Sequence, residues 1–179
     1  MLRFAETFVF FLLIVSVYLP NRHLGDAAGG KERTLAMIKP DGVSSNYTGE
    51  IRKIVLKAGF DIDKEMLTQL DMEAASAFYV EHLSKSFFPD LIKYMTSGPV
   101  LVMVLEKQNA VADWRALIGP TDARKAKISH PHSIRALCGI DSQRNCVHGS
   151  DSVHSAEREI MFFFMDAESG DTTVRHDEL

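Results

Sequence analysis

Residues 99–105 read PVLVMVL, an apolar run that contains no charged or polar side chain. A short continuous apolar run of this kind is typical of a strand in the middle of a sheet. We therefore expect a central strand at this place in the chain. The other elements are assigned outward from it.

Short strands and helical segments lie on both sides of this run. Residues 35–38 (LAMI) form a second apolar run that enters a Lys-Pro-Asp-Gly loop, and a further strand is expected from Phe60 to about Leu70. Helical spacing and terminal signals predict helices at 49–58, 73–83, 89–96, 109–118, 133–137, and from 151 or 152 to about 163. Residues 161–164 (MFFF) could instead begin a final strand. The order fits an α/β sandwich of the ferredoxin-like type with helices over one face, but it does not fix the strand pairing.

Length and charge limit the class of protein. The chain has 179 residues, is 46% hydrophobic and has a net charge of −4, as expected of one globular domain. A nucleic-acid ligand is not expected, because no basic excess is present to neutralise a phosphate backbone. Any phosphate ligand must instead be held by a few well-placed cations.

The first residues resemble a secretory signal. Residues 7–19 (TFVFFLLIVSVYL) carry no charge and are shorter than the roughly 20 residues that cross a bilayer. Small residues follow at 25–30, so we expect a cleaved signal peptide at 1–27. An uncleaved anchor and a buried hydrophobic segment are the alternatives.

The C-terminal residues also resemble a targeting signal. The domain is expected to span 33–166, and the polar tail 167–179 ends in HDEL, a retention signal of the endoplasmic reticulum that is read by a receptor. Asn46-Tyr47-Thr48 is an N-glycosylation sequon, which only a luminal chain could use. Together these features predict a protein of the endoplasmic-reticulum lumen that binds the retention receptor through HDEL.

The two cysteines, Cys138 and Cys146, are too few for a disulfide scaffold. We expect two partly buried free thiols, although an oxidising lumen would permit a disulfide. Two other patterns are rejected. GDAAGGK at 25–31 lacks the Ser or Thr of a phosphate loop, and His130-Pro131-His132 lacks further metal ligands at suitable spacing.

His148 lies in NCVHGSDS, residues 145–152. Neutral imidazole is a nucleophile near pH 7 if one ring nitrogen is free and the other is hydrogen-bonded. Ser150 and Glu159 could orient the ring. Charge neutralisation and hydrogen bonding of a phosphate could come from Lys39, Arg115, Arg135, Arg144, Asn145 and Thr121. From spacing alone, a structural histidine in a turn before a helix is the competing interpretation.

Five stretches in chain order resemble the nucleoside diphosphate kinase family. They are KPDG at 39–42, FFPDLIKYMTSGPV at 87–100, RALIGPTDA at 115–123, SIRALCG at 133–139, and RNCVHGSDS at 144–152 followed by SAEREI at 155–160. The resemblance covers about residues 33–162. It implies a ferredoxin-like α/β sandwich with an antiparallel four-stranded sheet.

The resemblance also implies a role for each site residue. His148 resembles the phosphorylated nucleophile, which Ser150 and Glu159 orient. Contacts to nucleoside di- and triphosphates are implied for Lys39, Tyr79, Phe87, Leu91, Arg115, Thr121, Arg135 and Asn145. Asp151 resembles an acidic residue near the Mg²⁺ that arrives with ATP or another nucleoside triphosphate.

The sequence departs from the family pattern in two places. The loop between Thr121 and Arg135 is a few residues longer, and a polar tail replaces the aromatic C-terminal segment of many members. Both segments take part in oligomer contacts in the family, so a homo-oligomer is possible but its order is open. The alternative to an active kinase is a weakly active or inactive nucleotide-binding or interaction module of the same fold.

Overall fold

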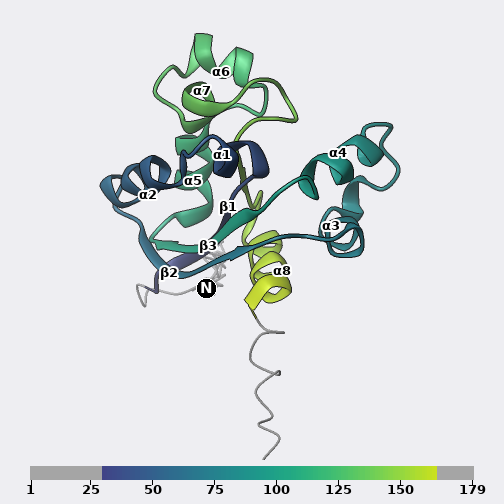
Figure 1. Ribbon diagram of the computed structural model, residues 1–179. Coiled ribbons are helices and arrows are strands. Elements are labelled where there is room, and N and C mark those ends of the chain that lie inside the picture. The colour runs from purple at the N-terminus through teal and green to yellow at the C-terminus, as the bar shows by residue number, and fades with distance from the viewer. Residues whose placement is uncertain (1–29, 165–179) are drawn as a thin grey trace, which may run out of the picture.

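The apolar run at 99–105 lies in the second strand of a four-stranded sheet with the order β2-β3-β1-β4 (Figure 1). All three strand pairings are antiparallel. The strands span Glu32–Ile38 (β1), Asp61–Thr68 (β2), Val100–Lys107 (β3) and Val147–Gly149 (β4). The sheet of the ferredoxin-like α/β sandwich is therefore confirmed, with β3 in its interior.

The structure is a computed structural model that describes residues 30–164. The expected signal peptide at 1–27 and the tail with HDEL at 167–179 lie outside the described residues. Within the described part of the chain, no helix has both the length and the apolar character needed to cross a membrane.

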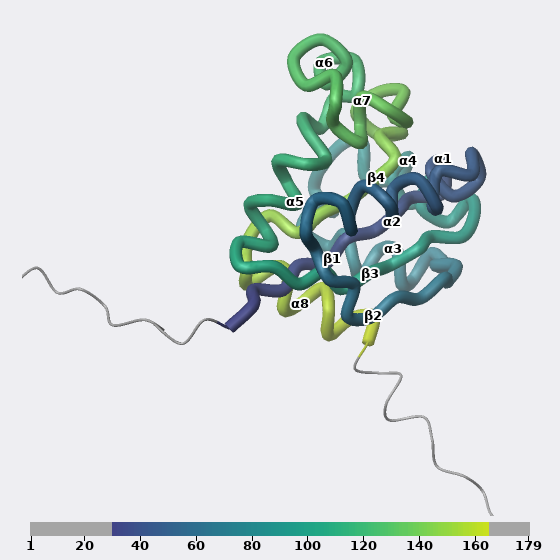
Figure 2. Tube along the Cα trace, turned by 90° about the vertical axis from the view of Figure 1, so that its left-hand side faces the viewer, coloured from purple at the N-terminus to yellow at the C-terminus, as the bar shows by residue number. Residues whose placement is uncertain are grey.

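Helices cover both faces of the sheet, so the expectation of helices over one face is wrong (Figures 1 and 2). They span Pro40–Ser44 (α1), Thr48–Lys57 (α2), Met72–Phe78 (α3), Phe88–Met95 (α4), Ala110–Ile118 (α5), Ala123–Ser129 (α6), Ile134–Cys138 (α7) and Val153–Phe164 (α8), with a 3-10 turn at Val80–His82. Helices α2, α5 and α7 pack on one face, and α3, α4 and α8 on the other.

The continuous apolar run follows from this two-sided cover. Val100, Val102 and Val104 pack under α3, α4 and α8, whereas Leu101 and Met103 face α2 and α5. Successive side chains of a strand point to opposite faces, so a strand covered on both sides needs an apolar residue at every position.

The segment that carries His148 is a short strand and not a turn. Val147–Gly149 forms β4, which pairs with β1 so that His148 lies opposite Met37. The hydrogen bonds that make this strand come from β1, which is more than a hundred residues earlier. Residues 161–164 do not form a final strand, because α8 continues to Phe164.

The expectation of two free thiols is also wrong. Cys138 ends α7 and Cys146 precedes β4, and their sulfur atoms form a disulfide with a Cα–Cα separation of 5.8 Å. A separation between about 4.4 and 6.8 Å is the normal range for a disulfide. The fold brings the end of a helix and the start of a strand to this separation, which spacing along the chain does not reveal.

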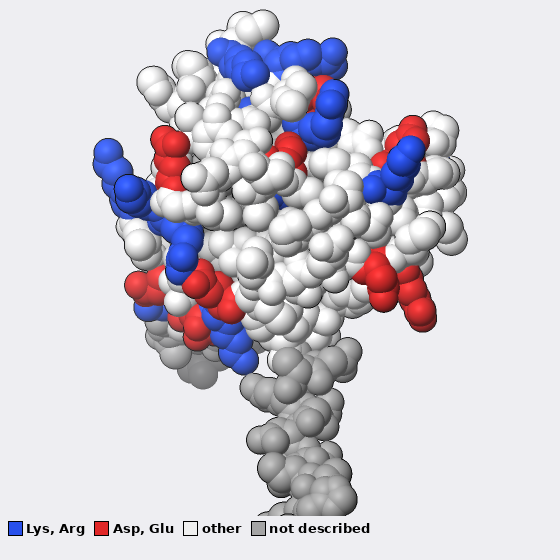
Figure 3. Space-filling view, viewed as in Figure 1, with Lys and Arg blue, Asp and Glu red and all other residues white. Residues whose placement is uncertain are grey.

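The loop between Thr121 and Arg135 contains α6, which projects from the end of the molecule at the top of Figure 1. Arg124, Lys125 and Lys127 lie on this helix, and basic side chains gather over this end in the space-filling view (Figure 3). Elsewhere on the face shown, acidic and basic groups are interspersed.

Candidate active site

A cleft of about 610 Å³ lies beside β4 and α8. It brings together most of the residues that the sequence singles out: Lys39, Tyr79, Phe87, Leu91, Arg115, Thr121, Arg135, Asn145, His148, Asp151 and Glu159. Ser150 is fully buried behind the cleft wall, although it still contacts Glu159. Residues that lie far apart in the chain therefore meet in one place.

The imidazole of His148 is held by one of its two nitrogens. Nε2 lies 2.9 Å from Glu159 Oε2, and the Ser150 hydroxyl donates to the same oxygen at 2.8 Å. A carboxylate only accepts hydrogen bonds, so Nε2 carries the proton and Nδ1 keeps a free lone pair. Within residues 30–164 no other group is hydrogen-bonded to Nδ1. The ring is thus oriented as a nucleophile requires.

The backbone around His148 is fixed as firmly as its ring. The indole Nε1–H of Trp114, a fully buried side chain, donates to the carbonyl of His148 at 3.2 Å. Gly149 permits this contact, because a Cβ there would lie 2.4 Å from the indole ring. On the other side, the Phe78 ring packs edge-on against the imidazole at 5.4 Å between centroids. Trp114 and Phe78 could not be predicted as site residues, because neither carries a chemical signature in the sequence.

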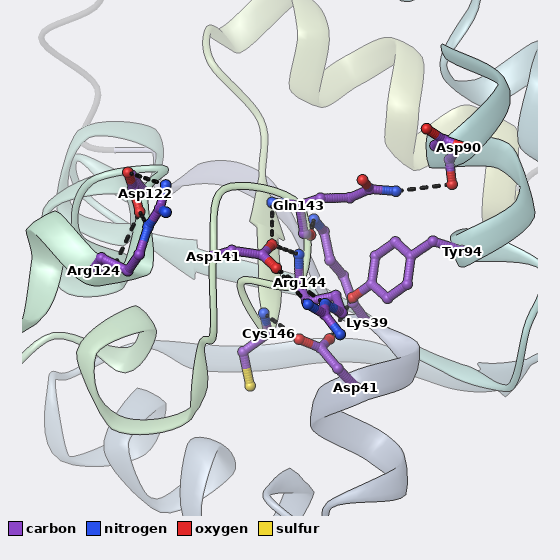
Figure 4. A network of polar contacts seen from close by, with 10 residues as sticks. All are labelled: Lys39, Asp41, Asp90, Tyr94, Asp122, Arg124, Asp141, Gln143, Arg144 and Cys146. Carbon is purple, nitrogen blue, oxygen red and sulfur yellow. Dashed lines mark hydrogen bonds and ion pairs between the residues drawn. The ribbon is translucent and has the colours of Figure 1, made fainter. Parts of the chain in front are cut away.

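Lys39 places a buried ammonium group in the cleft. Its Nζ donates to Asn145 Oδ1 at 2.7 Å. It also donates to the carbonyl of Gln143 at 3.1 Å, and Lys39 and Gln143 are both drawn in Figure 4. Burial, together with the positive charge of Arg135, lowers the pKa of Lys39 to about 8. An anion in the cleft would oppose both effects, because an opposite charge favours the protonated form.

Two arginines extend the positive region. Arg135 donates to the Gly119 carbonyl at 2.8 Å and to the Val147 carbonyl at 3.2 Å, which leaves its buried Nε–H without a partner among residues 30–164. Burial and the nearby charge of Arg115 lower the pKa of Arg135 to about 10. Like charges gathered in this way favour an anionic ligand that neutralises them.

Tyr79 has the second unsatisfied donor. Its hydroxyl is buried and has no hydrogen-bond partner in the described part of the chain. Burial, with a contribution from the charge of Glu159, raises the pKa of Tyr79, so the phenol stays protonated. A buried hydroxyl without a partner costs free energy, and a ligand acceptor would remove that cost.

The mouth of the cleft is lined by a different kind of side chain. Phe87 is 49% exposed, and Leu91 lies one turn further along the chain in α4. His82 packs tilted against Phe87 at 5.8 Å between centroids and stacks on Tyr79 at 6.1 Å. An exposed aromatic face beside an aliphatic residue suits a planar aromatic ligand.

Asn145 and Thr121 connect the two sides of the cleft. The side-chain nitrogen of Asn145 donates to the carbonyls of Thr121 and Ser142, at 2.9 and 3.0 Å. The oxygen of this amide accepts from Lys39, so both its oxygen and its nitrogen are hydrogen-bonded. In this conformation Asn145 positions Lys39 and the Thr121 loop.

Asp151 is the predicted acidic residue for a metal ion at the cleft. Its carboxylate accepts a hydrogen bond from Ser155, the main cause of a lowered pKa for Asp151. Residues 30–164 contain no group of three or more His, Cys, Asp or Glu side chains arranged to hold a metal ion. Mg²⁺ prefers one or two carboxylates plus substrate phosphates, so Asp151 suits an ion that the ligand brings.

One predicted cation lies elsewhere. Arg144 does not line the cleft; its guanidinium forms two hydrogen bonds with Asp141 (Figure 4). Two residues that the sequence analysis passed over, Glu81 and Arg158, form an ion pair of 3.2 Å at the cleft. Asp41 accepts from the Tyr94 hydroxyl at 2.5 Å and from the Cys146 N–H at 3.0 Å, below the Lys39 side chain.

Comparison with known proteins gives a consistent result. A family model described as nucleoside diphosphate kinase matches residues 32–169. The chain is 77% identical over 144 residues to the probable nucleoside diphosphate kinase 5 of Arabidopsis thaliana, an alignment that covers 80% of this chain and all of that protein. It is 46% identical over 137 residues to the nucleoside diphosphate kinase of Pasteurella multocida, covering 76% of this chain and 96% of that protein.

A solved structure is similar over the same region. The nucleoside diphosphate kinase of Aquifex aeolicus superposes with a TM-score of 0.74 and 40% sequence identity. The superposition covers 75% of this chain and 96% of that chain.

Proposed function

Because the chain belongs to the nucleoside diphosphate kinase family, we propose that it transfers the γ-phosphate of a nucleoside triphosphate to a nucleoside diphosphate through His148. The observation that carries the proposal is the imidazole of His148, held at Nε2 by Glu159 in a cleft with buried cations. A nucleophile oriented in this way, next to groups that neutralise phosphate charge, is what phosphoryl transfer requires of a protein.

In the first half-reaction, His148 Nδ1 attacks the γ-phosphorus. An N–P bond forms, the bond from phosphorus to the β,γ-bridging oxygen breaks, and the nucleoside diphosphate leaves with the electron pair. The ring becomes cationic, and the Nε2 proton stays on the nitrogen, where the Glu159 carboxylate stabilises the charge. Lys39, Arg115 and Arg135 neutralise the phosphate oxygens.

In the second half-reaction, a terminal oxygen of another nucleoside diphosphate attacks the phosphorus bound to His148. The N–P bond breaks, the ring regains its lone pair on Nδ1, and a nucleoside triphosphate leaves. The two halves use the same residues in reverse order, so each nucleotide occupies the same cleft in turn.

Mg²⁺ fits this site as a partner of the nucleotide. Asp151 lines the cleft and accepts from Ser155, outside the His148–Glu159–Ser150 hydrogen bonds, so its carboxylate could contact an ion that arrives with the nucleotide. When bound, the ion would neutralise part of the phosphate charge.

The mouth of the cleft supports a broad choice of base. Phe87 and Leu91 present an aromatic face and an aliphatic side chain, which contact the face of a base rather than its polar edge. Stacking of this kind tolerates different bases. We infer that the phosphate region, not the base, supplies most of the discrimination.

The direct test is to incubate the full chain with ATP labelled at the γ-phosphate. We expect a label that is stable to alkali and lost in acid, as expected of a phosphorylated histidine, and that moves to an added nucleoside diphosphate. A folded protein that binds ADP but takes up no label would support the alternative, a nucleotide-binding module without transfer activity.

ADP binding should weaken above pH about 8, because the pKa of Lys39 is lowered to about 8 and the ammonium is lost as the pH rises. A bound diphosphate favours the charged form, so the dissociation constant should rise by up to about tenfold per pH unit above the free pKa. The terminal phosphate, with a second pKa of about 6, does not titrate in this window.

Calorimetric titration with ADP between pH 7 and about 9.5 measures this profile. The Lys39→Gln variant should bind ADP weakly at every pH, without a bend near pH 8. The same bend in that variant would assign the titration to another group and contradict the role given to Lys39.

We also propose that the protein resides in the lumen of the endoplasmic reticulum. The Cys138–Cys146 disulfide supports an oxidising compartment, and Asn46 is exposed in a turn between α1 and α2. HDEL and the signal-like segment lie outside the described residues. Self-association and binding of a retention receptor stay predictions.

Expression of the full chain in a eukaryotic cell tests the location. We expect a glycosylated form that an endoglycosidase shortens on a gel and that the Asn46→Gln variant lacks. An unmodified chain found in the cytosolic fraction would contradict luminal residence.

A further inference from the structure

We propose that the Cys138–Cys146 disulfide positions the phosphate-binding side chains of the cleft, so that the cross-link strengthens nucleotide binding. The inference rests on the proposed function, because it concerns the same cleft. Neither cysteine lines the cleft; both lie in the layer behind it. They are therefore positioning residues.

The disulfide joins the two backbone segments that carry the phosphate-binding groups. Cys138 is the last residue of α7, three positions after Arg135. Cys146 lies between Asn145, which holds the Lys39 ammonium, and Val147, whose carbonyl accepts from Arg135. The cross-link thus fixes the separation of the arginine helix from the strand that carries His148.

Cys146 is the fixed end of this cross-link. Its N–H donates to Asp41 Oδ2 at 3.0 Å, and its carbonyl accepts from the Lys39 N–H at 2.9 Å (Figure 4). Its φ of 71° is in the left-handed region, which non-glycine residues occupy only when the surroundings hold them there. A Cβ on Gly42 would lie 2.8 Å from the Cys146 sulfur, so α1 packs directly against it.

The end of α7 has fewer contacts that could replace the cross-link. Ile134 anchors the first turn of this short helix in the core, but Leu137 and Ile140 are exposed at its other end. Across to β4, Arg135 makes one hydrogen bond, to Val147. A nucleotide phosphate would compete for that same guanidinium. The Ile140 N–H also donates to the Arg144 carbonyl at 2.7 Å, just before the β4 segment. The disulfide is the covalent connection between α7 and this segment, and ligand binding leaves it intact.

Opening the disulfide should therefore weaken nucleotide binding more than the transfer step. Without the cross-link, Arg135 must be ordered when the nucleotide binds, which we expect to raise the ADP dissociation constant roughly five- to tenfold. The ring of His148 is held by Glu159 of α8, which in turn accepts from Ser150, and neither of these hydrogen bonds involves a cysteine. The transfer rate at saturating nucleotide should change less than about twofold, because preorganisation of the nucleophile is kept.

The experiment compares ADP binding by calorimetry in the oxidised protein, the reduced protein and the Cys138→Ala/Cys146→Ala variant. Dithiothreitol supplies two electrons and two protons, which leaves two thiols on the protein and a cyclic disulfide in the reagent. We expect the weaker binding in both altered forms, with the single-turnover transfer rate retained. The matched control is Val55→Ala, which loses buried volume in α2 and leaves both cysteines in place.

Each outcome has a distinct meaning. Equal ADP affinity with and without the disulfide overturns the inference, as does an equal loss of affinity in Val55→Ala, which would show a general loss of stability. If the double variant does not fold, reduction of the folded protein, followed by circular dichroism, carries the test. Unfolding on reduction would also overturn it, since the cross-link would then hold the fold rather than the site. Absence of ADP binding by the oxidised protein marks failure of the proposed function instead.

Discussion

Replacement of His148 by asparagine should abolish phosphoryl transfer while leaving ADP binding nearly intact. The imidazole Nδ1 is the nucleophile in the proposed reaction, and an amide has no nitrogen of comparable nucleophilicity. Loss of a nucleophile that works together with a second residue lowers the rate by about 10⁴-fold or more. The phosphate contacts of Lys39, Arg115 and Arg135 do not depend on the imidazole, so the dissociation constant of ADP should change less than about threefold.

Labelling with γ-phosphate-labelled ATP measures the effect, with calorimetry for ADP on the same preparation. His154→Asn is the matched control, since His154 is an exposed residue of α8 that does not line the cleft. The control should take up the same label as the unaltered protein. A full label on the His148→Asn protein would place the phosphorylated group elsewhere and remove the central step of the proposal.

The central strand of the fold could be predicted because its signal is local. Residues 100–104 are apolar at every position, and both faces of β3 are buried. The strand that carries His148 could not be predicted in the same way. β4 has three residues, the last of them Gly149, and Ser-Asp-Ser follows, a composition typical of turns. It becomes a strand only because β1 supplies its partners.

In the site, too, sequence motifs predict some features, whereas others depend on contacts between distant segments. The nucleotide-cleft residues were identified from motifs in chain order, and the structure brings them together. Arg144 has the same charge as Arg135 and a position close to His148, yet Asp141 holds it away from the cleft. The Cys138–Cys146 pairing depends on the distance between a helix end and a strand start. Neither outcome follows from residue type or spacing.

Replacement of Glu159 by glutamine should lower the transfer rate by about 10²- to 10³-fold, the second-largest effect expected here. The carboxylate accepts from His148 Nε2 and so keeps the proton on that nitrogen. It also provides the negative charge that stabilises the ring once the N–P bond has formed. Glutamine keeps the shape but removes the charge.

The orientation of the new amide adds a second penalty. Arg158 Nη2 lies 3.7 Å from Glu159 Oε1, on the side away from the imidazole. A guanidinium donates only, so it favours the amide oxygen on its side. The amide NH₂ then faces His148 and the Ser150 hydroxyl, which can accept in place of donating. Nε2 must then accept a hydrogen bond, and the ring proton moves to Nδ1. The nitrogen that should attack phosphorus is then protonated, and this wrong tautomer is part of the expected loss of about 10²- to 10³-fold.

Single-turnover rates of phosphorylation and the ADP dissociation constant separate this effect from weaker binding. The rate should fall while the dissociation constant stays within about threefold, because the phosphate-binding cations are unchanged. Ser150→Ala is the informative comparison, since it removes one of the two hydrogen bonds to Glu159 Oε2 but keeps the charge and the tautomer. The transfer rate of Ser150→Ala should fall by about tenfold, which corresponds to the free energy of one hydrogen bond to a charged group. The single-turnover rate could instead fall by the same factor in Glu159→Gln and Ser150→Ala. The carboxylate would then act only by holding the ring in place, and neither its charge nor its control of the tautomer would contribute to transfer.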